Sequence, residues 1–175
     1  MTAITEEARA LPSSGSADTV APEAFREAMT RFASSVTVVT AYDGAVPVGC
    51  TATAVFSLTD RPPALLVSLA TGSTTLGNIR AAGRFAVNVL PWRLRGLAER
   101  FAVLPSAQRF EGVPHTARFG APLLDGAVAA MACRVTQYVP LADHTLVIGE
   151  VVHAETDQDG QPLVHFARRQ TRPEA

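Results

Sequence analysis

The sequence predicts a single β-rich α+β domain, because strand patterns outnumber helical patterns and the two kinds do not alternate. Six or more segments are short, apolar and rich in β-branched residues, which is typical of strands. Three other segments repeat their apolar residues at helical spacing. Strict alternation of strands and helices would indicate a doubly wound parallel sheet, so its absence favours a small barrel with helical appendages.

The three predicted helices are short. Pro22 begins the first, since a proline at the first helical position has no N–H to leave without a partner. Its apolar stripe follows at spacings of four and three residues and consists of Phe25, Met29 and Phe32. Ser73 predicts the cap of a second helix over residues 74–82, which ends at Gly83. The third helical pattern is formed by Leu94, Leu97, Ala98 and Phe101.

The predicted strands begin with a β-branched run at residues 36–40. The turn signal of Asp43 and Gly44 then predicts a second strand that returns through residues 48–51. Further apolar runs predict strands at residues 65–69, 85–90, 128–139, 145–154 and 163–166. A turn at residues 157–160 precedes the last of these strands.

Composition limits the class of protein. The chain has 175 residues, of which 47% are hydrophobic and 18% charged, enough for the core of one ordinary domain. Fifteen Lys and Arg against sixteen Asp and Glu give a net charge of -1, which argues against a nucleic-acid partner. The apolar runs fall far short of the ~18 residues that cross a bilayer, so no membrane partner is expected.

Residues 1–21 are expected to form a disordered lead-in to one domain over residues 22–175. The lead-in lacks the basic start and apolar core of a signal peptide, which predicts a cytoplasmic protein. Cys50 and Cys133 lie far apart in apolar segments and are expected to be buried, reduced thiols. The four histidines lack the spacing of metal ligands, so no metal centre is expected.

Small hydroxyl residues gather at two strand ends, at residues 51–57 and 71–75. The second group precedes a predicted helix, where backbone N–H groups and hydroxyls suit a phosphate or another anion. Gly72 would let a ligand approach the chain closely. Hydroxyl-rich turns also occur purely as caps, so the residues alone leave both interpretations open. The dinucleotide fingerprint GxGxxG and the phosphate loop GxxxxGK[ST] are absent.

His144 follows Asp143 at the start of a predicted strand, where an imidazole suits contact with a polar cofactor or a proton donor role. A structural or merely exposed histidine is the alternative. A small basic cluster near the C-terminus is formed by Arg168, Arg169 and Arg172. It is interpreted either as a solvated tail or as a phosphate clamp.

A series of short motifs runs through the chain in a distinctive order. These are FREAM at residues 25–29, FA at 32–33, VTVVT at 36–40, GCTA at 49–52 with Ser57, PP at 62–63 with LLVSL at 65–69, FAVNVL at 85–90, LA at 97–98 with FA at 101–102, RF at 109–110, GAPLL at 120–124 before Cys133, DHT at 143–145, IGEV at 148–151 and PL at 162–163. In order and spacing, from about residue 23 to residue 171, the chain resembles the short-chain flavin reductases. These are the reductase components of two-component flavin-dependent monooxygenases.

The resemblance implies an FMN-binding split β-barrel with short helical appendages. It also implies a homodimer with the flavin near the subunit interface. In the reaction that it implies, NADH or NADPH passes a hydride to FMN, or to FAD, and the reduced flavin diffuses to a separate monooxygenase. Such an enzyme needs little acid–base machinery, because hydride transfer is the chemistry of the two small molecules.

Site residues follow from the same resemblance. The flavin ring and ribityl chain would be lined by Thr51, Ala52, Thr53, Ala54, Val55 and Ser57. The phosphate side of the flavin would be held by Gly72, Ser73, Thr74, Asn78 and Ile79. His144 matches the histidine that contacts the nicotinamide, and is the predicted catalytic residue. The segment beside the pyridine nucleotide would contain His165, Phe166 and Arg168.

Two departures from the family pattern affect this site. Relatives often carry Lys or Arg around positions 72–74, whereas this chain has only hydroxyls beside the glycine. Phosphate binding would then rest on backbone amides or on an arginine from elsewhere, such as Arg80, Arg100 or Arg168. Many relatives also have an aromatic residue where Gln170 follows Arg169. Two alternatives therefore stay open, a flavin-binding module without reductase activity and a direct oxidoreductase with tightly bound flavin.

Overall fold

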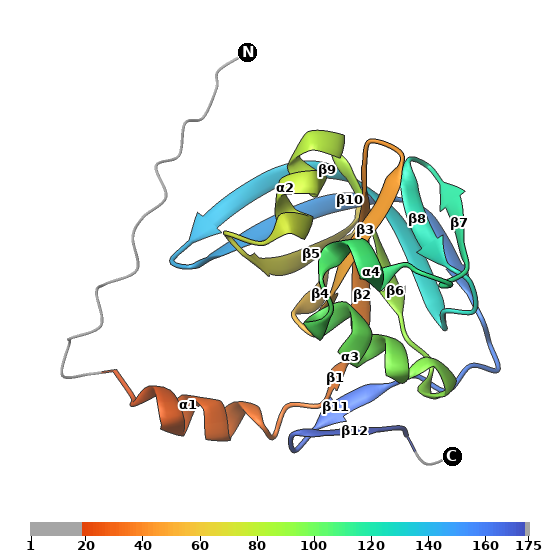
Figure 1. Cartoon of the computed structure of the whole chain (residues 1–175). Helices are drawn as coiled ribbons and strands as arrows, with labels where there is room; N and C mark the ends of the chain where they lie inside the picture. The colour runs from red at the N-terminus through yellow and green to blue at the C-terminus, as the bar shows by residue number, and fades with distance from the viewer. Residues whose placement is uncertain (1–18, 174–175) are drawn as a thin grey trace, which may run out of the picture.

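The computed structural model describes residues 19–173, and its centre is a seven-stranded antiparallel sheet (Figure 1). Across the sheet the strands follow the order β3-β2-β6-β9-β10-β5-β4. Their bounds are β2 (Thr37–Asp43), β3 (Val46–Ala52), β4 (Val55–Asp60), β5 (Pro63–Ala70), β6 (Arg84–Val89), β9 (Ala129–Leu141) and β10 (His144–Thr156). Every neighbouring pair is antiparallel, and no doubly wound parallel sheet is formed by the described residues.

Two small sheets and several short helices lie around the large sheet. One small sheet has the order β1-β11-β12, and the other pairs β7 with β8. The bounds of these strands are β1 (Ser34–Ser35), β7 (His115–Arg118), β8 (Ala121–Leu124), β11 (Val164–Phe166) and β12 (Arg169–Thr171). The helical elements are α1 (Pro22–Met29), α2 (Thr74–Ala82), the 3-10 turn η1 (Trp92–Leu94), α3 (Gly96–Val103) and α4 (Ser106–Arg109). The predicted β-rich α+β class with short helical appendages is confirmed.

The two edges of the large sheet, β3 and β4, are consecutive in the chain and are joined only by residues 53–54. This short link makes the sheet curl, and β3 contacts β5 as well as its own ladder partner β2. Among the described strands, hydrogen bonds do not close the sheet between β3 and β4. Closure into the split barrel that the resemblance implies therefore stays a prediction.

Helix α2 covers part of the sheet and contributes to the main core. Its side chains Leu76 and Ile79 are buried together with Phe85 of β6. The Oγ atom of Ser73 accepts a hydrogen bond from the Leu76 N–H at 3.1 Å, which caps the helix. Gly83 ends the helix in the left-handed region, with a φ of 65°. Both ends of this helix are where the sequence predicted them.

A second core lies under α3. Its buried residues include Phe101 of α3, Val38 of β2, Leu90 and Leu163. The predicted third helical pattern is divided in the structure, because Leu94 belongs to η1 and the following apolar residues belong to α3. Both cysteines are free thiols as predicted, with Cys133 buried and Cys50 half-buried.

The sequence did not predict several strands, and β4 is the most important of them. β4 is an edge strand that pairs only with β5, and most of its residues are exposed. An exposed edge strand needs no continuous apolar run, which is the signal used to predict strands. The hydroxyl-rich group at residues 51–57 therefore covers the end of one strand and the start of another. By contrast, the long predicted strands form the hairpin β9–β10 with only small shifts at their ends.

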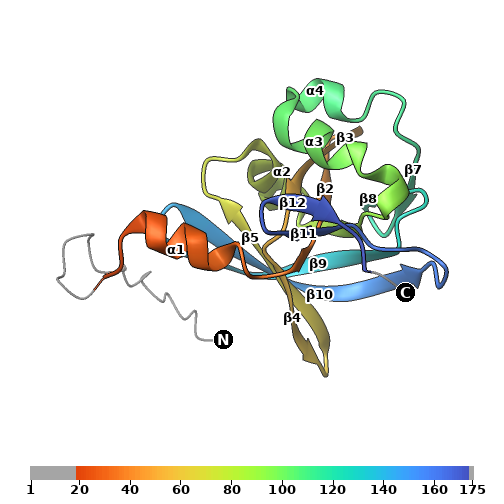
Figure 2. The ribbon, with the colours of Figure 1, turned by 90° about the horizontal axis from the view of Figure 1, so that it is seen from below.

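Helix α1 starts at the predicted Pro22 and lies apart from the hydrophobic cores (Figures 1 and 2). None of its residues is buried. Most of the expected lead-in over residues 1–21 lies outside the described residues. Among residues 19–173, no helix is both long and apolar enough to cross a membrane.

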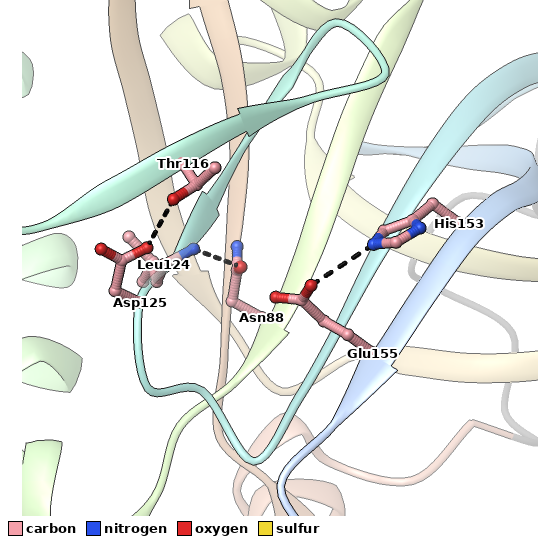
Figure 3. A network of polar contacts seen from close by, with 6 residues as sticks. All are labelled: Asn88, Thr116, Leu124, Asp125, His153 and Glu155. Carbon is pink, nitrogen blue, oxygen red and sulfur yellow. Dashed lines mark hydrogen bonds and ion pairs between the residues drawn. The ribbon is translucent and has the colours of Figure 1, made fainter.

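Asn88 of β6 is fully buried and joins three parts of the fold. Its Nδ2 atom donates to the carbonyl oxygen of Val38 at 3.0 Å and to Thr40 Oγ1 at 3.1 Å. Its Oδ1 atom accepts from the Leu124 N–H at 2.8 Å, as Figure 3 shows. The other polar pairs in that view are Thr116 with Asp125 and His153 with Glu155. The amide therefore fixes the β7–β8 hairpin to the large sheet.

We predict that Asn88→Ala lowers the free energy of unfolding by about 2–4 kcal/mol, because it leaves the buried Leu124 N–H without an acceptor. The measurement is urea denaturation followed by circular dichroism. Thr116→Ala removes an exposed hydrogen bond of the same hairpin and should change the stability by no more than about 0.5 kcal/mol. Equal losses in the two variants would contradict the special role of Asn88.

Candidate functional site

The turn at residues 71–73 and His144 are neighbours, because β10 pairs with β5 at their ends. His144, the first residue of β10, lies opposite Ala70, the last residue of β5. The Thr71 N–H donates to the carbonyl oxygen of Asp143 at 2.9 Å, and the hydroxyls of Thr71 and Thr145 lie 3.1 Å apart. The predicted catalytic residue is thus attached to the predicted phosphate turn through backbone pairing.

The hydroxyl-rich segment at residues 51–57 reaches the same end of the molecule. The Ser68 N–H of β5 donates to the carbonyl oxygen of Ala54 at 3.0 Å, and Val55 pairs with Val67. On the other side of the turn, the side chains of Cys50 and Thr75 are hydrogen-bonded, which links β3 to α2. The two hydroxyl-rich segments that the sequence singled out, residues 51–57 and 71–75, therefore lie close together, although they come from separate elements.

The start of α2 has the properties of an anion site. The first N–H groups of a helix have no acceptor within the helix, and Ser73 Oγ satisfies only that of Leu76. Thr74 and Gly72 are exposed, and a Cβ added at Gly72 would meet no atom within 4 Å. The space beside the turn is thus open, and amides and hydroxyls are available to a phosphate group.

Asn78 and Ile79, one turn further along α2, differ in what they can offer. The Nδ2 atom of Asn78 is buried without a hydrogen-bond partner among the described residues, so it can donate to an incoming acceptor. The side chain of Ile79 is completely buried in the main core. A contact of Ile79 with a bound phosphate would therefore be made by its backbone.

Thr51 and Ala52 also serve the fold more than the predicted flavin ring. The Thr51 hydroxyl donates to the carbonyl oxygen of Ala98 at 2.6 Å and so holds α3 against β3. Ala52 is buried at the end of β3. Thr53 and Ser57, by contrast, are exposed. The hydroxyls of the segment that remain exposed are therefore those of Thr53 and Ser57.

The three arginines considered for phosphate binding each have another partner. The guanidinium group of Arg100 donates to the carbonyl oxygens of Arg109, Gln108 and Glu111. Arg168 forms an ion pair with Glu27 at 2.8 Å. The guanidinium carbon of Arg80 lies 5.4 Å from the centre of the Tyr138 ring. In this structure a bound phosphate would therefore rely on the amides and hydroxyls of the turn.

Arg109 lies near the turn at residues 71–73, and the sequence analysis assigned no role to this arginine. Its guanidinium group donates to the carbonyl oxygen of Gly49 at 2.7 Å and to that of Leu104 at 2.7 Å. Burial raises the pKa of the Cys50 thiol, while the hydrogen bond with Thr75 and the charge of Arg109 lower it. A positive charge thus lies close to Cys50 at the end of β3. The only signal for it in the sequence was the Arg-Phe motif at residues 109–110.

His144 is about half exposed, and its imidazole is oriented by the preceding residue. The Nδ1 atom donates to Asp143 Oδ1 at 2.8 Å. That hydrogen bond lowers the pKa of the Asp143 carboxyl, which therefore stays ionised as an acceptor. With Nδ1 occupied in this way, Nε2 is the atom left for a ligand.

The predicted nicotinamide segment, which contains His165, Phe166 and Arg168, lies in a different part of the fold from His144. His165 pairs with Ser34 across β11 and β1, close to the base of α1 (Figure 2). A cavity of about 340 Å³ begins beside this pair and is lined by Ser34, Ser35, Thr53, Val55 and Phe56 among others. Residues 53–55 therefore lie between the two parts of the predicted site, with the turn and His144 on one side and β11 on the other.

The chain matches the family model described as flavin reductase like domain over residues 29–174. It therefore belongs to this family. The match covers most of the described structure, including the turn, His144 and β11.

Individual relatives extend this result. The chain is 42% identical to an actinorhodin polyketide dimerase of Streptomyces coelicolor, over 82% of each chain. It is 37% identical to an FMN reductase (NADH) of Ancylobacter novellus, over 87% of this chain and 86% of the relative. It is also 37% identical to the reductase component of a 4-hydroxyphenylacetate 3-monooxygenase of Thermus thermophilus, over 83% and 93% of the two chains.

Solved structures are similar as well. The NADH:FAD oxidoreductase SgcE6 of Streptomyces globisporus superposes with a TM-score of 0.83 at 30% identity, covering 91% of this chain and 99% of its own. The same protein has been solved in complex with NAD and FAD fragments, and that structure superposes with a TM-score of 0.81.

Proposed function

We propose that the protein is an NAD(P)H-dependent flavin reductase, which transfers a hydride from reduced nicotinamide to FMN and supplies reduced flavin to a partner monooxygenase. The observation that carries the proposal is the attachment of His144 to an open, hydroxyl-rich helix start in a chain of the flavin reductase family. Relatives named as NADH-dependent FMN reductases and as monooxygenase reductase components support it.

The residues suit FMN as a phosphate-bearing substrate. The start of α2 offers amides and hydroxyls to the phosphate, and the exposed hydroxyls of Thr53 and Ser57 offer polar contacts to the ring and ribityl chain. FAD is a second possible substrate, supported by the structural relative that is named as an NADH:FAD oxidoreductase. The names of the relatives favour NADH over NADPH as the hydride donor.

His144 positions the nicotinamide in this proposal. Hydride transfer between the two bound molecules needs no proton donor in the same step, so orientation is the main task of the protein. Asp143 holds the imidazole by its Nδ1 atom and leaves Nε2 to contact the nicotinamide. His165, Phe166 and Arg168 are proposed to lie beside the same nucleotide.

A homodimer forms part of the proposal. Its support is the family membership and the exposed apolar side chains of α1 and β4, which include Phe25 and Phe56. We also expect a cytoplasmic location, because reduced nicotinamide is available there and both cysteines are free thiols.

A second candidate function is the oxidation of an organic substrate by a chain that retains its flavin. The relative that is 42% identical carries the name of a polyketide dimerase and is not named as a reductase, which favours this candidate. The two candidates differ in whether flavin is released. Flavin retention therefore separates them.

The first experiment measures oxidation of NADH and of NADPH by the purified protein, with and without added FMN, from the absorbance of the reduced nicotinamide. We expect turnover only when free flavin is present, with saturation at FMN concentrations on the order of micromolar. Turnover without added flavin, by a protein purified with flavin bound, would support the second candidate. Flavin binding without any turnover would contradict both and leave a flavin-binding module.

For His144→Ala we expect the KM for the reduced nicotinamide to rise about tenfold, while the Kd for FMN stays nearly unchanged. Steady-state kinetics and fluorescence titration of FMN measure the two effects. His153→Ala is the matched control, since His153 is bonded to Glu155 and lies outside the proposed site. If FMN binding failed and the nicotinamide KM did not move, the role given to His144 would be wrong.

Ser73→Asp separates capping from phosphate binding. Aspartate caps a helix as well as serine, so the free energy of unfolding should change by less than about 0.5 kcal/mol. Its negative charge should repel the phosphate and raise the Kd for FMN at least ~10-fold.

The affinity for riboflavin, which has no phosphate, should barely change in this variant. Gln158→Asp adds the same charge at an exposed turn and controls for net charge. An equal loss of riboflavin and FMN affinity would place the phosphate elsewhere.

A further inference from the structure

The hairpin turn between β11 and β12 holds two residues other than glycine in the left-handed region of φ. Ala167 has a φ of 49° and Arg168 a φ of 61°, and these two residues form the whole turn. A two-residue turn with two positive φ values favours asparagine and glycine, because the Cβ atom of other residues is crowded there. The turn therefore depends on contacts with other parts of the fold to keep its shape.

Those contacts come from the end of helix α1. The Ala167 N–H donates to the carbonyl oxygen of Thr30 at 2.9 Å, and the guanidinium group of Arg168 donates to Glu27 Oε2 at 2.8 Å. Glu27 and Arg168 are 141 positions apart in the chain, so no local pattern indicates that they meet. The fold thus places a carboxylate beside the guanidinium group of the predicted nicotinamide segment.

This ion pair is accessible to a ligand. The side chains of Arg168 and Glu27 are 68% and 61% exposed. Within residues 19–173, Glu27 Oε1 accepts no hydrogen bond, and Arg168 donates only through Nη2. An exposed ion pair contributes little to the stability of a fold. Both groups therefore have hydrogen-bonding capacity left for a bound molecule.

The pair lies on the side of the proposed site that is remote from the nicotinamide ring. His144 is proposed to contact that ring, and residues 53–55 lie between His144 and β11. A nucleotide that extends from His144 past residues 53–55 presents its other end, the adenosine ribose, to the turn between β11 and β12. Glu27 and Arg168 are the oppositely charged groups bonded to each other at this end.

The adenosine ribose is the part in which NADH and NADPH differ. The 2′-hydroxyl of NADH can donate a hydrogen bond to a carboxylate, whereas the 2′-phosphate of NADPH is an anion that a guanidinium group binds. The carboxylate of Glu27 repels a phosphate and already occupies Arg168, which would otherwise bind it. The pair therefore accepts the hydroxyl and disfavours the phosphate.

We propose that Glu27, through its ion pair with Arg168, makes the protein select NADH over NADPH. This inference rests on the proposed function and adds the residue that decides which nucleotide donates the hydride. Glu27 determines specificity at the adenosine ribose and takes no part in hydride transfer. Arg168 is held ready for a phosphate but is neutralised by the carboxylate.

The first test is Glu27→Gln, which removes the charge and keeps an oxygen that can accept from the ribose hydroxyl. With FMN present, kcat/KM for NADPH should rise about tenfold, while kcat/KM for NADH should change by less than about threefold. Glu23→Gln is the matched control, because it removes the same charge from the same helix at a residue paired with Arg26. Equal gains for NADPH in both variants would overturn the role of Glu27.

A second set of variants tests whether the freed guanidinium group binds the phosphate. In the double variant Glu27→Gln with Arg168→Ala, the gain for NADPH should disappear. Glu27→Gln with Arg169→Ala is its control and should keep most of the gain. All three side chains are exposed, so each variant should fold, which circular dichroism checks. A gain that survives Arg168→Ala, or that is lost only with Arg169→Ala, would overturn the assignment to the pair.

Binding without turnover gives an independent measurement. Adenosine 2′,5′-bisphosphate and adenosine 5′-monophosphate carry the ribose with and without the 2′-phosphate. In isothermal titration calorimetry, Glu27→Gln should lower the Kd for the bisphosphate about tenfold and leave the Kd for the monophosphate within about threefold. A bisphosphate that binds this variant no more tightly than it binds the native chain would overturn the proposal.

The titration also separates this inference from the proposed function, because it requires neither flavin nor hydride transfer. A native protein that oxidises neither NADH nor NADPH in the presence of FMN would overturn the reductase activity. The two adenosine phosphates would still decide the role of Glu27. Conversely, native turnover with NADPH as efficient as with NADH would overturn the selection by Glu27 and leave the reductase activity in place.

Discussion

The pairing of β10 with β5 is the interaction on which the candidate site depends. It sets His144 opposite Ala70 and brings Asp143 within hydrogen-bond distance of Thr71. The register of β10 is in turn enforced in the core, where a Cβ at Gly149 would lie 2.6 Å from the Phe85 ring. A slip by one residue would bury the wrong face of the strand and move His144 away from the turn.

The charges around the candidate site suit a ligand that binds weakly and is released. Arg100 donates to backbone carbonyl oxygens, Arg168 pairs with Glu27, and Arg109 donates to the carbonyl oxygen of Gly49. What faces the open turn is a set of amides and hydroxyls, which bind a phosphate more weakly than a bidentate guanidinium does. Weak anchoring fits a flavin that serves as a substrate and departs after reduction.

Apolar side chains are exposed in two places, on α1 and along the edge strand β4. The cavity of about 340 Å³ lies between them, because Ser34 and Ser35, which follow α1, and Val55 and Phe56 of β4 all line it. The C-terminal hairpin binds the base of α1 on one side and borders the cavity through β1 on the other. The base of α1, β1 and the C-terminal hairpin that contains His165 are therefore attached to one another.

The sequence by itself determined the local features of this protein. Ser73, Gly83 and Pro22 mark helix ends through local backbone chemistry, and the apolar runs mark the buried strands, so these predictions were confirmed. Only the tertiary structure decided which side chains are free for a ligand, since the Thr51 hydroxyl donates to Ala98 of α3 and Ile79 is buried in the core. It also decided that β4 is a strand and that Arg109 lies near the turn. Those features depend on contacts between residues far apart in the chain, and no local pattern encodes such contacts.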